Sequence, residues 1–269
     1  AIANLVESTG PTERFLVFDF GGGTLDVTVM NMTTNDGYKS FQVISTHGDT
    51  FLGGVDFDRE IADLIVAGLS HAYQDECRKY FDTTGKKDAE LKAAQIKRGR
   101  LRNLAKKVKE KKFCKKPEGD DHLISVDIEG LGDDLEGVTI DISYSDFLKK
   151  TNYLFDRCMQ CVDTALKKRN ILKESITKVL MVGGSSNFEQ VQDRLDRFFE
   201  GRIKIQQKVD YLLSVAKGAG LLAHQLGTGA TDFSIQEVCP VSLGISHWNP
   251  KINKNLIEHL IKASDPIPI

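Results

Sequence analysis

The 269-residue chain lacks the long apolar runs of a membrane protein, because its uninterrupted apolar stretches are only a few residues long. Its first residues also lack the basic and apolar pattern of a signal peptide, so we expect a cytoplasmic protein, with an organelle lumen as the alternative. The five cysteines are odd in number and scattered, which fits a reducing compartment. Cys158 and Cys161 have redox or metal spacing, but they lie in a helix-like run without a partner pair. We interpret them as structural thiols.

Charge is distributed unevenly, although the formal net charge is only −2. Residues 86–116 hold 11 Lys and 3 Arg, that is 14 basic residues against 3 acidic ones, for a local net charge of +11. Such a block can bind nucleic acid or an acidic partner. It has few aromatic residues to stack on bases, and its apolar residues recur at helical spacing. We therefore expect a solvated helix face and no nucleic-acid binding.

The most informative segment is a glycine-rich turn between two apolar runs, residues 15–20 and 25–30. Both runs are rich in Phe, Leu and Val and too short for typical helices, which predicts strand, turn, strand. Glycines in the turn permit positive φ and let backbone N–H groups approach an anion. Asp19 and Asp26 beside such a turn would repel a phosphate unless a cation lay between, which suggests Mg²⁺.

The sequence of this turn has two other interpretations. A plain hairpin whose tight turn uses glycines would look similar in sequence. A Walker loop is excluded, because that motif needs Gly-Lys-Ser/Thr at the start of a helix, and neither the lysine nor the helix follows here.

Further glycine turns and periodic segments follow along the chain. Residues 41–45 predict a third strand, residues 48–58 a glycine turn with acidic residues, and residues 57–72 an amphipathic helix. A basic helix is expected over about 88–112, paired strands over 122–128 and 138–142, and a helix with Ser145 as its N-cap. Residues 178–187 predict a buried strand that ends in Gly-Gly and runs into a helix, a second anion site or a plain strand-to-helix turn. A helix over 211–226, a linker and a strand over 233–238 follow.

In this order the segments resemble the nucleotide-binding domain of the DnaK-type, seventy-kilodalton heat-shock chaperones, within the actin and sugar-kinase superfamily. Phe18-Asp-Phe-Gly-Gly-Gly-Thr-Leu-Asp-Val27 is similar to the family's second phosphate motif, and residues 48–58 to its neighbouring signature. Val182-Gly-Gly-Ser-Ser186 resembles the adenosine motif, and Pro240-Val-Ser-Leu-Gly-Ile245 the opening of the β substrate-binding domain.

The resemblance implies an α/β fold. It would be an actin-like ATPase lobe, with a central mixed sheet flanked by helices, an inserted α+β outer subdomain and a short β-type C-terminal tail. The second lobe of the nucleotide-binding domain would span 1–226, with a core of 1–48 and 145–226 and an outer subdomain of 49–144. Residues 227–232 would be a linker and 233–269 the start of the substrate-binding domain. The first lobe would precede residue 1, so we expect this chain alone not to turn over ATP.

The resemblance also implies a site for ATP or ADP with Mg²⁺. Asp19, Thr24 and Asp26 would be catalytic, with Asp19 and Asp26 near the metal ion. The residues that would contact the nucleotide are Gly21, Gly22, Gly23, Thr24, Gly183, Gly184, Ser185, Asn187, Lys106 and Lys109.

The adenine side departs from the family pattern, which clamps the base with Glu, Lys, Arg and Ser on one helix. Here Lys106 or Lys107 stands in place of the acid, Phe113 or a neighbour in place of the hydroxyl, and Asn187 in place of a stacking arginine. The acidic, leucine-rich interdomain linker is also absent from residues 227–232.

Three functions follow from the resemblance. The first is a fragment of an ATP-dependent molecular chaperone that couples hydrolysis to the binding of unfolded or extended client peptides, with J-domain co-chaperones and nucleotide-exchange factors as partners. The second, favoured by the altered adenine side, is a chaperone-related pseudo-ATPase or an exchange-factor-like binding protein. The third, a small-molecule kinase, fits the motifs least. No membrane association is expected.

Overall fold

The computed structural model describes residues 12–69, 71–79, 84–118, 122–128, 131, 135, 137–206, 213–230, 233–239, 241–262 and 265–267. The contacts divide the chain into two compact units. The first unit takes the described residues of 1–51, 158–186 and 193–269, and the second those of 52–157 and 187–192. The core and outer subdomains of the resemblance stay a prediction, and each unit is described by itself.

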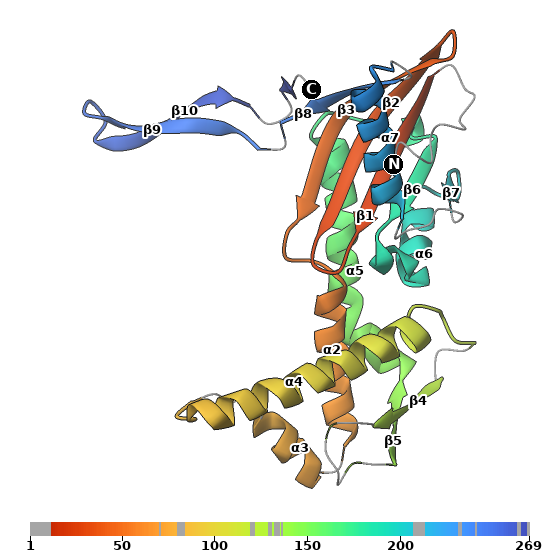
Figure 1. Ribbon diagram of the computed structural model, residues 1–269, viewed down its shortest axis with the longest axis vertical. Coiled ribbons are helices and arrows are strands. Elements are labelled where there is room, and N and C mark those ends of the chain that lie inside the picture. Colours follow the sequence, from red (N-terminus) through yellow and green to blue (C-terminus); the bar gives the residue numbers. More distant parts are fainter. Residues whose placement is uncertain are drawn as a thin grey trace. The chain divides into compact units, whose positions relative to one another are not determined.

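The first unit is built on a seven-stranded mixed sheet with the strand order β11-β8-β3-β2-β1-β6-β7. Strands β1, β2 and β3 are antiparallel neighbours, whereas β6 runs parallel to β1 and β8 parallel to β3. Helices flank this sheet (Figure 1), so the predicted α/β class with a central mixed sheet is confirmed. The strands are β1 (Thr12–Phe20), β2 (Leu25–Asn35), β3 (Tyr38–Asp49), β6 (Lys178–Val182), β7 (Lys204–Gln206), β8 (Phe233–Val238) and β11 (Pro266–Ile267).

The turn between β2 and β3 explains why these strands extend further than the apolar runs indicated. Asp36 and Gly37 both have positive φ, at 49° and 85°, and Asn35 pairs directly with Tyr38. A two-residue Asp-Gly loop of this kind matches the right-handed twist of the strands on either side. The turn therefore fixes the register of a long hairpin whose outer parts are polar.

Buried apolar residues lie on both faces of the sheet, and one cluster of them lies on the face that α7 covers. Phe15, Met32, Phe41 and Leu180 belong to a buried cluster on β1, β2, β3 and β6, and Leu222 of α7 packs against it. Helix α7 (Ser214–Thr228) crosses this face in front of the sheet (Figure 1). It runs two residues beyond the predicted end and stops at Gly229, which adopts a left-handed conformation.

Helices α5 (Tyr144–Lys167) and α6 (Glu189–Phe198) both contain a boundary between the units. Within the first unit, the buried Ser45 hydroxyl on β3 donates a 2.6 Å hydrogen bond to the Ala165 carbonyl of α5. The predicted N-cap Ser145 lies inside α5, because the helix begins one residue earlier. A short 3₁₀ helix, η3 (Lys173–Ser175), precedes β6.

The described strands of the C-terminal segment belong to two sheets, and its assignment to a separate domain stays a prediction. The strand predicted over 233–238 is present as β8, but it joins the central sheet through pairs with residues 39–42 of β3. The rings of Phe233 and Phe41 meet edge to face, with centroids 6.2 Å apart. Two further strands, β9 (Leu243–Asn249) and β10 (Lys254–Ile261), form an antiparallel hairpin of their own.

The second unit consists of helices and a two-stranded sheet. Its elements are α2 (Gly54–Gly68), α3 (His71–Lys79), α4 (Asp88–Val108), the π-helix η1 (Lys109–Phe113), β4 (Leu123–Ile128), β5 (Val138–Ser143) and the first part of α5. The helix predicted to reach residue 72 ends at Gly68, where Leu69 becomes extended. The predicted pairing of the strands β4 and β5 is confirmed.

Helix α4 ends differently from the prediction. A single basic helix was expected to about residue 112, but the last turn widens into η1, in which the Cys114 N–H donates to the Lys109 carbonyl. A π-turn accommodates one extra residue within a helix. Lys109 and Phe113, the first and last residues of η1, are both buried.

Aromatic rings fill the core of the second unit. Phe57 of α2 lies 4.8 Å from Phe155 and 4.6 Å from Phe188, measured between ring centroids. Phe113 of η1 lies 4.4 Å from Phe147 of α5. The rings connect four segments that are far apart in sequence. Among the described helices, none combines the length and apolar character that a membrane crossing requires.

Replacement of Phe41 by Ala should lower the free energy of unfolding by about 3–5 kcal/mol, because it leaves a cavity in the cluster between β3 and β8. Phe51 provides a matched control, since its side chain is 82% exposed. Phe51→Ala should change stability by no more than about 0.5 kcal/mol. Urea unfolding monitored by circular dichroism measures both, and equal losses would contradict the assignment of the core.

Candidate functional site

The turn between β1 and β2 presents an open glycine backbone. The Gly21 N–H closes the turn by donating to the Thr24 carbonyl at 3.0 Å, and Gly22, Gly23 and Thr24 are exposed. None of the three glycines has positive φ, so the left-handed conformation expected from the sequence is not used here. A Cβ added at Gly22 or Gly23 would meet no atom within 4 Å. The glycines instead leave space beside the backbone that an anion could fill.

Asp19 and Asp26 face each other across this hairpin. They are direct cross-strand partners, so their side chains share one face of the sheet. Asp19 is half-buried and Asp26 is exposed. Burial, and then the nearby Asp26 carboxylate, raise the pKa of Asp19 above its ordinary value. Two carboxylates held this close favour a cation between them.

The second glycine turn lies against the first. Gly183 follows β6 with φ of 82°, and a Cβ at this position would lie 2.4 Å from the Phe20 carbonyl oxygen and 2.9 Å from the Asp19 carboxylate. The Ser185 hydroxyl donates to the Gly21 carbonyl at 2.8 Å. The structure therefore brings Asp19, Gly21, Gly183 and Ser185 together.

Gly48 and Ser186, which are not among the predicted site residues, also stabilise this arrangement. A Cβ at Gly48 would lie 2.5 Å from the Leu25 carbonyl oxygen and 2.9 Å from the Asp26 carboxylate, so only glycine lets β3 approach there. Ser186 is fully buried, and its hydroxyl donates to the Val182 carbonyl at 2.5 Å. Both belong to the glycine motifs of the sequence, but their roles depend on contacts between distant strands.

A pocket of about 370 Å³ extends from the two aspartates along the sheet. Thr28 and Thr46 contribute hydroxyl groups, and Glu237 of β8 adds a third carboxylate to the lining. Alternation along β2 explains the position of Thr28, because it lies two residues from Asp26 on the same face. Glu237 could not be found this way, since the sequence does not show that β8 joins the sheet. The lining residues are Val17, Asp19, Asp26, Thr28, Met30, Val43, Thr46, Glu237 and Val238.

The turn after Gly183 differs from the predicted direct entry into a helix. Residues Gly184–Asn187 form the short 3₁₀ helix η4, and α6 begins only at Glu189. The backbone N–H of Glu189 donates to the Cys114 carbonyl at 2.9 Å, so the first amide of α6 is used within the fold. Asn187 is exposed.

The remaining predicted contacts of the nucleotide, Lys106 and Lys109, lie in the second unit. Lys106 is exposed and lies 4.0 Å from the Glu110 carboxylate. Lys109 is only 6% exposed. Its ammonium group lies 2.7 Å from the Asp58 carboxylate and donates to the Gly54 carbonyl at 2.9 Å. Burial raises the pKa of Asp58, while the hydrogen bond from Lys109 opposes this shift.

The family model described as Hsp70 protein matches residues 1–269, which is the whole chain. The chain belongs to the Hsp70 family. It is 32% identical over 244 residues to the chaperone protein DnaK of Psychrobacter cryohalolentis, an alignment that covers 89% of this chain and 35% of that protein. It is 28% identical over 247 residues to the chaperone protein DnaK of Endomicrobium trichonymphae, covering 91% of this chain and 36% of that protein. The chain thus spans about a third of the length of these Hsp70 relatives.

Gly183→Ala should destabilise the first unit by about 2 kcal/mol or more, because it combines an unfavourable φ with a clash against the Phe20 carbonyl. Gly22→Ala is the matched control. Its new methyl group meets open space, so the stability should stay within about 1 kcal/mol of the parent chain. Thermal unfolding of both variants tests the contact, and an unchanged midpoint for Gly183→Ala would refute it.

Lys109→Met should lower the free energy of unfolding by about 3 kcal/mol, since it leaves the buried Asp58 carboxyl without its partner. Lys106→Met removes the same charge from an exposed pair and should cost no more than about 0.5 kcal/mol. Adding Asp58→Leu to Lys109→Met should restore part of the loss. Urea unfolding provides the measurement, and equal costs at positions 106 and 109 would contradict a structural role for the buried pair.

Proposed function

We propose that this chain forms one lobe of the nucleotide site of an ATP-dependent chaperone, with ATP or ADP and Mg²⁺ as its cofactors. The observation that carries the proposal is the convergence of Asp19 and Asp26 with the exposed Gly21–Gly23 backbone and the Gly183 turn. Membership of the Hsp70 family supports it, because that family implies nucleotide binding, generally with Mg²⁺.

The residues of the hairpin fit the phosphate end of such a ligand. The backbone beside Gly22 and Gly23 has room for phosphate oxygens, and exposed amides there would donate to them. Thr24 adds an exposed hydroxyl at the same turn. On the other side of the turn, Ser185 is already bonded to Gly21, so its role is to hold the two glycine motifs together.

The Asp19 and Asp26 carboxylates suit a Mg²⁺ ion that is also bound to a phosphate. The described residues contain no group of three or more acidic, His or Cys side chains able to hold a metal ion by themselves. Mg²⁺ is commonly held by one or two carboxylates, water and substrate phosphates, so Asp19 and Asp26 suit a nucleotide-bound ion. When bound, the ion would neutralise phosphate charge. Asp19 and Asp26 would orient it and its waters.

We extend the proposal to the whole protein, which would act in a chaperone cycle. Client peptides, J-domain co-chaperones and nucleotide-exchange factors are the partners that it would have as an Hsp70 chaperone. The connection of β8 to the sheet supports coupling, because Glu237 and Val238 line the same pocket as the two aspartates. Any movement of the C-terminal segment would therefore alter the lining of the proposed site.

Millimolar MgADP should slow hydrogen–deuterium exchange in peptides that cover residues 19–27, and should leave peptides of the β9–β10 hairpin unchanged. Gly22→Ala should weaken the apparent affinity for MgADP, measured from this protection, at least about tenfold. Its methyl group occupies the space proposed for phosphate. Gly99→Ala also adds a methyl group to open space, on α4, and should behave as the parent chain. If MgADP protects no residue of the hairpin, or if the two variants respond equally, the proposal fails.

A further inference from the structure

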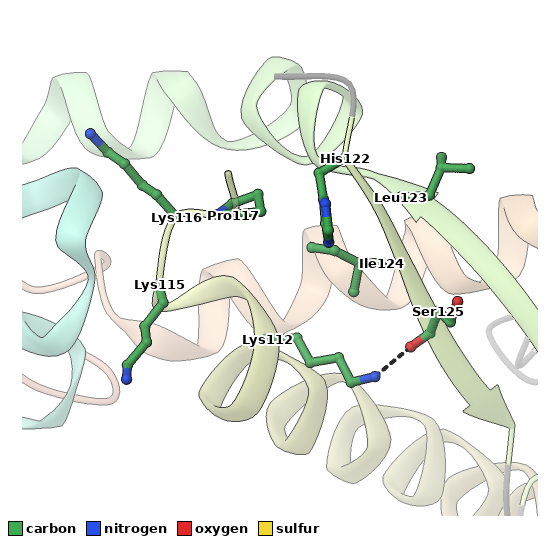
Figure 2. Close-up of a pocket in the computed structure, with 8 residues that line it drawn as sticks. All are labelled: Lys112, Lys115, Lys116, Pro117, His122, Leu123, Ile124 and Ser125. Atoms are coloured by element: carbon green, nitrogen blue, oxygen red, sulfur yellow. Dashed lines mark hydrogen bonds between the residues drawn. The ribbon is translucent and has the colours of Figure 1, made fainter. Parts of the chain in front are cut away.

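A second pocket, of about 380 Å³, lies in the second unit where the basic segment ends. It is shown in Figure 2, with Lys112 lying across toward Ser125 while Lys115 and Lys116 extend away from His122. All three lysines are exposed, and none of the eight lining residues is acidic. The lining also has an apolar part. Its residues are Lys112, Lys115, Lys116, Pro117, His122, Leu123, Ile124 and Ser125.

The pocket lies along the outer edge of β4. The Tyr144 N–H donates to the His122 carbonyl, so the backbone groups of His122 face β5. Since these groups alternate along an antiparallel strand, those of Leu123, Ser125 and Asp127 face away from β5. The Ser125 carbonyl confirms this direction, because it accepts a 2.6 Å hydrogen bond from the Lys112 ammonium group. Within the described part of the chain, β4 pairs with β5 alone.

Lys112 therefore covers a carbonyl that a further strand would use. A lysine at a sheet edge discourages pairing with unselected chains. An acidic side chain on an incoming strand would attract the ammonium group and release the Ser125 carbonyl to a backbone N–H. The edge is thus arranged to accept an extended chain with acidic residues in preference to other chains.

The positions of the charges favour a peptide over a small anion. In Figure 2 the ends of Lys112, Lys115 and Lys116 point in different directions, so they do not converge on one phosphate or sulfate. Acidic side chains spaced along a strand could contact them separately. Pro117, Leu123 and Ile124 offer apolar contacts between the charges. Nucleic acid fits less well, because His122 is the one ring able to stack on a base among the lining residues.

We propose that this lysine pocket binds the acidic side chains of an extended peptide segment that adds to the outer edge of β4. The proposal gives a function to the C-terminal part of the basic segment, residues 86–116, which carries a local net charge of +11. It does not depend on the nucleotide site, because all lining residues belong to the second unit.

The test uses a fluorescein-labelled peptide of alternating glutamate and valine, and the same peptide with glutamine for glutamate. Fluorescence polarisation should detect binding of the glutamate peptide to the whole chain at low salt, and the binding should weaken as salt rises. The triple variant Lys112→Gln, Lys115→Gln, Lys116→Gln should lose at least about tenfold in affinity. The matched control, Lys92→Gln, Lys107→Gln, Lys111→Gln, removes three exposed charges outside the pocket and should lose less than about threefold.

A second pair of variants tests the strand edge. Leu123→Pro removes an N–H that faces away from β5, at the first position of the strand, where proline is tolerated. It should weaken binding at least about fivefold relative to Leu123→Ala, which keeps the N–H. Circular dichroism verifies folding of every variant, and Lys112→Arg, which keeps the charge, should still bind.

Three results would overturn the proposal. The first is an equal loss of affinity in the pocket and control triple variants. The second is equal binding of the glutamate and glutamine peptides. The third is a single-stranded oligonucleotide that binds more tightly than the glutamate peptide and depends on the same three lysines.

Discussion

The close approach of Gly183 to the end of β1 is the contact on which the first unit's site depends. Strand β6 pairs in parallel with β1 up to Val182 beside Asp19, and the next residue must then turn without a side chain. Any Cβ there would lie only 2.4 Å from the Phe20 carbonyl oxygen. The positive φ of Gly183 and its missing side chain together place the Ser185 hydroxyl on Gly21. Two segments more than 160 residues apart in sequence thus form one side of the proposed nucleotide site.

Gly48 makes the corresponding contact on the other side of the hairpin. It allows β3 to approach the Leu25 carbonyl and the Asp26 side chain. The exposed turn is therefore held at its base by glycines from two directions, while Gly22 and Gly23 at its tip remain open. The same residue type has two different purposes here. At the base it permits dense packing, and at the tip it leaves space for a ligand.

Local patterns were sufficient to predict the strands of the hairpin, the pair β4 and β5, and the strand that ends in Gly183. These depend on alternation and on glycine turns, which are properties of neighbouring residues. The attachment of β8 to β3 was not predictable in this way, because parallel pairing at a sheet edge depends on contacts between segments distant in sequence. The inward direction of Lys109 was also missed. It follows from the helix itself, because Lys109 lies one turn after the buried residue Ala105 and so shares the buried face of α4, where it meets Asp58.

The two pockets are lined by charges of opposite sign. In the second unit one lysine, Lys109, is buried and compensated by Asp58 at 2.7 Å, whereas the lysines of the pocket stay exposed with no acidic residue in the lining. In the pocket of the first unit the lining is acidic, because Asp19, Asp26 and Glu237 line it and no basic residue does. Phe233 and Ile235 of β8 pack on the core cluster, and alternation carries Glu237 to the same face, into the pocket of Asp19 and Asp26. A pocket lined by three carboxylates repels a bare phosphate, and a cation bound to the phosphate reverses that repulsion. The strand that attaches the C-terminal segment therefore adds a third carboxylate to the pocket beside the proposed site.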